Sequence, residues 1–179
     1  MLENKLGITD STELARAEEK ISKQKAIEMF ENGFLEKLEP GTYESLAAIH
    51  KYLFDGIYDF AGKLRKVNLS KGSFRFAPLM YLEAALQSID KMPQSTFDEI
   101  IEKYVEMNVA HPFREGNGRV GRLIMFKECL KYNIVPFIIE DNLKLFYYRG
   151  LKEWDNEKGY LTDTCLTAPV SYTHLTLPT

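Results

Sequence analysis

The chain has 179 residues, a formal net charge of −3 and 45% hydrophobic residues, which suits one domain around a single core. Acidic and basic residues are interspersed, so we expect no direct binding of nucleic acid. The two cysteines, Cys129 and Cys165, form no CxxC pair and predict reduced, structural thiols in a cytoplasmic protein. The first residues lack a signal-peptide pattern, and we expect no membrane span.

The apolar pattern is helical from the start of the chain. Asp10 with Glu13 predicts a capped helix that ends at Gly33, and Thr42 opens a second helix. Residues at helical spacing on these segments are expected in the core. They are Leu14, Ala17, Ile21, Ile27 and Phe30 on the first, and Leu46, Ile49, Leu53, Phe54 and Ile57 on the second.

A third helix carries Leu82 and Leu86 and ends before Pro93, and Ser95 with Asp98 is expected to cap a fourth. The helix that follows residue 118 should stop near Asn133 and Pro136, and Asp141 should open a last helix. No internal repeat or low-complexity linker interrupts this pattern. The sequence therefore predicts a single all-α domain, a helical bundle over residues 1–169.

Residues 65–77 are the exception to the helical pattern. They alternate weakly and contain Ser70-Lys71-Gly72-Ser73, which predicts the turn of a β-hairpin with Phe74 and Phe76 on one side. The basic residues of this segment are compatible with a plain solvated edge as well as with a binding element.

The run from His111 to Arg122 concentrates residues that bind and attack phosphates. Gly116-Asn117-Gly118 allows a sharp turn whose backbone N–H groups can approach an anion, and the helical pattern begins directly after it. Arg119 and Arg122 share one helix face, where two guanidinium groups can hold phosphate oxygens. Alone, each feature is also compatible with an ordinary turn or a solvated face.

Two further side chains complete this run. Glu115 is a hard oxygen ligand beside the turn and suits Mg²⁺, which takes one or two carboxylates together with phosphate oxygens. His111 is placed to act as the general base for a hydroxyl that attacks the phosphate. A histidine at a helix end is also compatible with a cap or a satisfied core residue.

The run resembles the signature of the Fic family, His-Pro-Phe-x-Asp/Glu-Gly-Asn-Gly-Arg-x-x-Arg, at every fixed position. The resemblance extends over roughly residues 40 to 160 and is greatest to small stand-alone bacterial Fic proteins, some of them toxin-like. It implies a Fic-type helical bundle with a short β-hairpin flap over the active site. It also implies a protein adenylyltransferase, which moves AMP from ATP to a Ser, Thr or Tyr hydroxyl of a target protein and releases pyrophosphate.

By the same resemblance, His111 deprotonates the target hydroxyl, Phe113 anchors the loop and Glu115 holds Mg²⁺ against the phosphates. The Doc branch of the family, which phosphorylates its target, has lysine at the position of Gly118, so the glycine favours AMP transfer. The residues expected to bind the nucleotide are Gly116, Asn117, Gly118, Arg119 and Arg122 of the signature, Lys71, Gly72, Ser73 and Phe74 of the flap turn, and Tyr147. For Tyr147, packing in the core is an equally good interpretation.

The resemblance also directs attention to regulation and to targets. Many Fic enzymes are inhibited by a helix with the motif Ser/Thr-x-x-x-Glu-Gly/Asn, whose glutamate pairs with the second arginine, here Arg122. No position of this chain fits that motif, so we expect either a C-terminal inhibitory helix beyond this chain or a separate antitoxin. Relatives modify the ATPase subunits of DNA gyrase and topoisomerase IV, and self-modification is a further expectation.

Residues 170–179 differ in character from the rest of the chain. They carry no charge and three threonines, and codons that encode them resemble a sequencing adapter. We therefore expect a non-native tail and a natural chain that is truncated near Ala168 or Pro169, with a genuine disordered tail as the alternative. Two other functions remain open: a Fic enzyme that uses another donor or removes AMP, and a catalytically silent module that senses nucleotides or binds partners.

Overall fold

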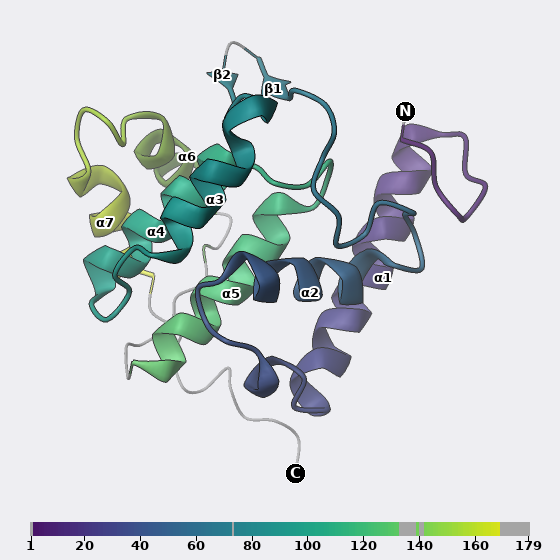
Figure 1. The fold of residues 1–179 in the computed structure, drawn as a ribbon, viewed down its shortest axis with the longest axis horizontal. Helices are drawn as coiled ribbons and strands as arrows, with labels where there is room; N and C mark the ends of the chain where they lie inside the picture. The colour runs from purple at the N-terminus through teal and green to yellow at the C-terminus, as the bar shows by residue number, and fades with distance from the viewer. Residues whose placement is uncertain (1, 73, 133–138, 140–141, 169–179) are drawn as a thin grey trace.

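The computed structural model describes residues 2–72, 74–132, 139 and 142–168. Within these residues the chain forms seven α-helices, two short 3-10 helices and one two-stranded hairpin (Figure 1), as an all-α bundle with a hairpin requires. In chain order the elements are α1 (Ser11–Glu31), η1 (Leu35–Lys37), α2 (Tyr43–Phe54), β1 (Ser70–Lys71), β2 (Phe74–Arg75), η2 (Leu79–Tyr81), α3 (Leu82–Asp90), α4 (Phe97–Ala110), α5 (Asn117–Lys131), α6 (Lys144–Lys152) and α7 (Gly159–Leu166).

Helix α1 begins where the sequence predicts, but only part of its predicted apolar stripe is buried. Asp10 is its N-cap and accepts a hydrogen bond from the backbone N–H of Glu13. The predicted core positions Ile27 and Phe30 are 53% and 45% exposed, whereas Glu18 and Ser22 are buried. Leu14 of the predicted stripe is buried in the first hydrophobic cluster, so the prediction is correct at the start of the helix and wrong at Ile27 and Phe30. The polar Glu18 and Ser22 share the buried face because they contact an arginine, described below.

Helix α4 starts one residue later than the predicted cap. Thr96, not Ser95, is the N-cap, and it forms a capping box with Glu99. Both Ser95-x-x-Asp98 and Thr96-x-x-Glu99 satisfy the sequence rule, but the longer glutamate reaches back to the backbone N–H groups of Ser95 and Thr96. This cap fixes the start of the helix that leads to His111.

Helices α2, α4 and α5 form the centre of the molecule. α5 packs against both α2 and α4, α1 packs against α2, and α3 packs against α4. α6 and α7 pack against each other and lie on the side of the molecule opposite to α1 (Figure 1). The central helices therefore lie between α1 on one side of the molecule and α6 and α7 on the other.

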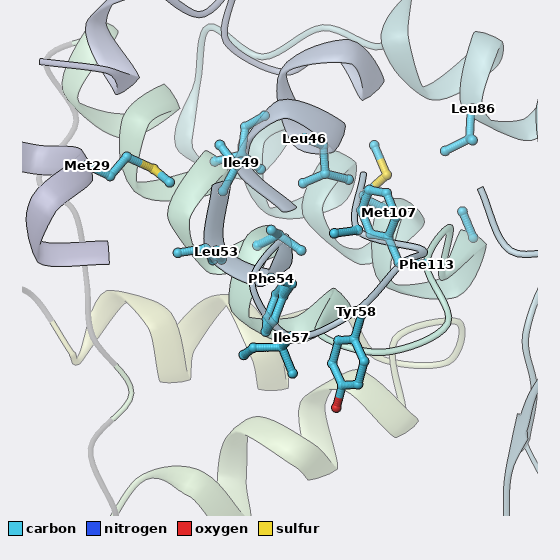
Figure 2. Close-up of a cluster of buried hydrophobic side chains, with 14 of the residues drawn as sticks. Met29, Leu46, Ile49, Leu53, Phe54, Ile57, Tyr58, Leu86, Met107 and Phe113 are labelled. Atoms are coloured by element: carbon cyan, nitrogen blue, oxygen red, sulfur yellow. The ribbon is translucent and has the colours of Figure 1, made fainter. Parts of the chain in front are cut away.

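Two hydrophobic clusters fill the spaces between these layers. The first gathers Leu46 and Ile49 of α2, Phe113 of the signature loop and the start of α5 (Figure 2). The second joins the first half of α4, the later part of α5, and α6 and α7; its members are Ile100, Ile101, Tyr104, Val105, Met125, Cys129, Tyr147, Trp154, Leu161, Cys165 and Ala168. Each cluster takes residues from α4 and α5.

The hairpin is present, with a tighter turn than the sequence suggests. Ser70 pairs with Arg75 and Lys71 with Phe74, so Ser70 and Lys71 belong to the strand and only two residues connect the strands. Gly72, with φ +61°, has the left-handed backbone that such a turn needs.

Some expectations lie outside the described residues. They are the helix stop near Asn133 and Pro136, the cap at Asp141 and the tail at residues 170–179, all of which stay predictions. No helix in the part of the chain that the structure describes is long and apolar enough to cross a membrane.

Candidate active site

His111 terminates α4 in an unusual backbone conformation. Its φ and ψ are 50° and 61°, the left-handed region, and no other non-glycine residue described has a positive φ. Such a conformation costs free energy and persists only where the surroundings enforce it. Its backbone N–H still donates to Met107 O at 3.0 Å, so His111 ends the helix and turns the chain into the signature loop.

Among the described residues, one ring nitrogen of His111 forms a hydrogen bond and the other, Nε2, has no hydrogen-bond partner. Nδ1 lies 3.2 Å from the carbonyl oxygen of Asn108; because a carbonyl only accepts, Nδ1 carries the proton and Nε2 keeps its lone pair. Burial lowers the pKa of His111 to about 4, against the opposing effect of the Asn108 carbonyl, and the cations of Arg65 and Lys71 lower it further. The ring is therefore neutral at pH 7 and able to accept a proton.

The loop that follows is closed by Asn117. Its side chain accepts from the backbone N–H of Phe113 and donates to the carbonyl of Phe113, both at 2.8 Å. Phe113 is fully buried, as expected for an anchor. Asn117 is itself 7% exposed, so its side chain shapes the loop, and what it can offer an anion is its backbone N–H.

His50 of α2 is hydrogen-bonded to the middle of the signature loop. Its Nε2 donates to Glu115 O at 2.9 Å, its Nδ1 accepts from the N–H of Gly62 at 2.9 Å, and its ring stacks on Phe113 at 4.0 Å. Gly116 has φ +77°, and a Cβ there would lie 2.6 Å from the Phe54 ring. Only glycine fits this position.

Helix α5 begins at Asn117, so its first turn faces the loop. The N–H groups of Arg119 and Val120 bond to Gly116 O, while those of Asn117 and Gly118 lie where a helix lacks internal acceptors. A Cβ on Gly118 would lie 3.3 Å from Nη1 of Arg122. A larger residue at this position would displace the arginine.

A pocket of about 600 Å³ opens at this helix end. Glu115, Arg119 and Arg122 of the signature line it, together with Tyr58 and a stretch of α1 that includes Glu18. Three of the predicted phosphate and metal ligands therefore meet at one cavity. His111 is not among the residues that line it and lies at the other end of the loop.

Glu18 is a residue of this pocket that the sequence patterns did not reveal. It forms an ion pair with Arg119 and accepts a hydrogen bond from the Tyr58 hydroxyl, and Ser22 accepts from Arg119 Nη1 at 3.0 Å. The available signal was the spacing of Glu18 and Ser22 four and eight residues after Leu14, on its buried face. Glu18 does not fit the inhibitory motif, and its partner is Arg119 and not Arg122.

Comparison with known proteins agrees with this geometry. The sequence model of the Fic/DOC family matches residues 40–129. A probable protein adenylyltransferase Fic from Salmonella typhimurium is 32% identical over 134 residues, 69% of this chain and 64% of its own length. The probable protein adenylyltransferase y4lH from Sinorhizobium fredii is 30% identical over 144 residues, 74% of this chain and 71% of its own length.

The chain belongs to the Fic/DOC family. It spans less than two thirds of the length of the Salmonella relative, 64%. Its fold is also that of solved Fic structures: the BepC protein of Bartonella tribocorum, with bound AMPPNP, superimposes with a TM-score of 0.75 at 18% identity, over 96% of this chain and 94% of that one. The Fic domain of Bep8 from Bartonella sp. 1-1C gives 0.76 at 16% identity, over 95% and 91%.

The residues that the Fic resemblance assigned outside the signature lie elsewhere. Tyr147 is 5% exposed in the second cluster, where its hydroxyl meets that of Tyr104, which matches the core interpretation. Lys71 and Gly72 lie in the exposed flap and do not line the pocket. Ser73 and the side chain of Phe74 are outside the described residues. Nucleotide binding by these residues stays a prediction.

The flap contributes a contact that the sequence did not indicate. The ring of Phe76, just after β2, stacks on the His111 ring with centroids 3.7 Å apart and planes inclined by 16°. The predicted position of Phe76 on one face of the hairpin is compatible with this contact. The flap therefore lies over the His111 ring, and its residues are not among those that line the pocket.

Proposed function

We propose that the chain transfers AMP from ATP to a Ser, Thr or Tyr hydroxyl of a target protein and releases pyrophosphate. The observation that carries this proposal is the neutral His111 ring with Nε2 available, on a loop whose other end is the first turn of α5. The names of the relatives, which are protein adenylyltransferases, and the AMPPNP bound to BepC support it.

The chemistry follows from these positions. Nε2 of His111 takes the proton of the acceptor hydroxyl as its oxygen forms a bond to the α-phosphorus of ATP. The bond from that phosphorus to the bridging oxygen breaks, and its electron pair leaves with pyrophosphate. The N–H groups of Asn117 and Gly118 and the guanidinium of Arg122 face the charge that develops on the phosphate oxygens.

Glu115 is the residue that would hold Mg²⁺. It is exposed, lines the pocket beside both arginines and presents a carboxylate oxygen, which fits an ion that takes its remaining ligands from phosphates and water. No group of three or more metal-binding side chains occurs in the described residues, so the phosphates would be needed to complete the site. When bound, Mg²⁺ would neutralise phosphate charge.

Gly118 supports AMP transfer over phosphorylation. The guanidinium of Arg122 lies next to Gly118, since a Cβ at position 118 would lie 3.3 Å from its Nη1. A lysine, as in the Doc branch, would have to displace Arg122 and change how the triphosphate lies. With glycine in place, we assign the α-phosphate to the α5 end and the outer phosphates to the arginines.

ATP labelled with ³²P on either the α- or the γ-phosphate tests the proposal in a bacterial lysate and on the chain itself. We expect label from the α-phosphate alone on protein, at least 100-fold less with His111→Ala, and no loss with the matched control His174→Ala. Transfer of the γ-label would instead indicate phosphorylation, and labelling by UTP alone would indicate another donor; either result contradicts the proposal.

Mass spectrometry of the labelled bands would identify the target, for which a cytoplasmic gyrase or topoisomerase IV ATPase subunit is our first candidate.

A further inference from the structure

Arg65, in the segment between α2 and β1, is a buried cation bonded only to backbone carbonyls in the contacts described. It is 3% exposed, and no ion pair joins it to a carboxylate in the described part of the chain. Nε donates to His111 O at 2.8 Å, Nη1 to Val67 O at 2.7 Å, and Nη2 to Ala110 O at 3.2 Å and to Ala77 O. Burying a charge in this way is costly unless each donor is satisfied.

The four carbonyls belong to two separate parts of the site. Ala110 and His111 are at the C-terminus of α4, where helix carbonyls lack internal partners and a cation is favoured. Val67 and Ala77 lie on the two legs of the flap, before β1 and after β2. A guanidinium presents its donors in one rigid plane, so Arg65 fixes the two parts relative to each other.

Backbone hydrogen bonds continue the same connection. The N–H of Arg65 donates to Pro112 O at 2.9 Å, and that of Ala77 donates to Val109 O at 3.0 Å. Between Val109 and Pro112 lie Ala110 and His111, and the left-handed backbone of His111 needs such enforcement. The same arrangement brings Phe76 of the flap onto the His111 ring.

We propose that Arg65 is a positioning residue for AMP transfer: it locks the flap to the end of α4, so that His111 and the flap meet the acceptor hydroxyl in one geometry. This inference rests on the proposed function. Arg65 does not line the pocket, and among the described contacts it touches none of Glu115, Arg119 and Arg122. Its loss should therefore slow the transfer step and leave ATP binding in place.

Three variants separate this role from general stability. Arg65→Met keeps the length of the side chain without donors, Arg65→Lys keeps a cation without the planar fork, and Arg16→Met removes an exposed arginine of α1 as a control. At saturating ATP we expect the single-turnover rate to fall on the order of 100-fold with methionine, as for a displacement of about 1 Å, and on the order of 10-fold with lysine. The dissociation constant of ATP should stay within about twofold in all three.

A second readout does not depend on activity. Because the Phe76 ring stacks on the His111 ring, its ring current should shift the NMR signals of the His111 ring protons. Arg65→Met should move these signals towards the values of a Phe76→Leu variant. Unchanged ring signals and an unchanged rate would overturn the inference, as would equal losses of rate and ATP binding. If wild-type protein transfers no AMP, the proposed function fails, whereas the NMR comparison still tests the lock; should the methionine variant not fold, the lysine variant supplies both measurements.

Discussion

His50 and His111 are both kept neutral by burial, but only one of them is available for catalysis. His50 uses both ring nitrogens, Nε2 towards Glu115 O and Nδ1 towards the N–H of Gly62. Within the described part of the chain, His111 uses Nδ1 alone. The same residue type is thus a structural support at the middle of the loop and the proposed base at its start, and the hydrogen-bond partners decide which.

The burial of His50 predicts how stability depends on pH. Its pKa is lowered from 6.5 to about 4, so the folded state binds fewer protons and the stabilisation present above pH 6.5 is lost as the pH falls towards 4. Over this range we expect the free energy of unfolding to fall by up to about 3 kcal/mol more in the wild type than in His50→Gln. Urea titrations at several pH values measure this difference, and parallel curves for the two proteins would contradict it.

Gly116 of the signature loop and Gly72 of the flap turn allow a matched comparison of two glycine substitutions. Both have positive φ, but a Cβ at position 116 would meet the Phe54 ring, whereas nothing lies within 4 Å at position 72. We expect Gly72→Ala to cost about 1 kcal/mol from backbone strain alone. Gly116→Ala should cost about 3 kcal/mol from strain and overpacking together and should weaken ATP binding. Equal losses in thermal unfolding would show that the Phe54 contact is unimportant.

At the scale of elements, the docking of α1 depends on a polar cluster as well as on apolar residues. Glu18, Ser22 and Tyr58 surround the guanidinium of Arg119, and the positions that an apolar stripe would place in the core at the end of α1 are exposed. α1 thereby becomes one wall of the phosphate pocket. Helix α1 is far from the signature in sequence, yet it determines the surroundings of Arg119.

Removing Glu18 should show how much this polar cluster contributes to the free energy of unfolding. Breaking a buried pair leaves an unpaired charge and costs about 3 to 5 kcal/mol; because the Arg119 side chain is 32% exposed, we expect about 2 kcal/mol for Glu18→Ala. The adjacent, exposed Glu19→Ala should change the free energy of unfolding by less than about 0.5 kcal/mol. Urea unfolding compares them, and a neutral Glu18→Ala would show that α1 is held by apolar contacts alone.

The sequence predicted elements well and their exact ends less well. Caps at Asp10 and Thr42 were confirmed because a single short side chain determines each. The cap of α4 was placed one residue early because two overlapping patterns satisfy the same rule, and only the reach of Glu99 separates them. The two-residue turn of the flap depends on strand register, which local sequence does not specify.

At the scale of the whole molecule, α4 and α5 join two hydrophobic clusters. Met107 and Val120 lie in the first cluster, and Ile101 and Met125, on the same two helices, lie in the second. Gly121 lets α5 approach α4 closely, since a Cβ there would lie 3.2 Å from the Tyr104 ring. Neither cluster can be lost without disturbing the two helices that hold His111 and the phosphate pocket.

This arrangement predicts cooperative unfolding. Trp154, the single tryptophan, is 6% exposed in the second cluster, so its fluorescence reports that cluster, while far-UV circular dichroism reports all helices. We expect coincident urea transitions by the two probes. Gly121→Val, which separates α4 from α5, should lower both midpoints together, whereas two separate transitions would mean that the clusters are independent.

The sequence by itself determined the helical class, the flap and the order of groups along residues 111–122, because these follow from short-range periodicity and from a motif within one loop. Tertiary structure decided the roles of His50, Glu18 and Arg65, each of which has a partner 46 to 101 residues away in the chain. Their signals are weak locally because each is a single polar residue whose burial is tolerated only by distant donors and acceptors. Periodicity reveals which face of an element is buried, but only packing reveals what that face meets.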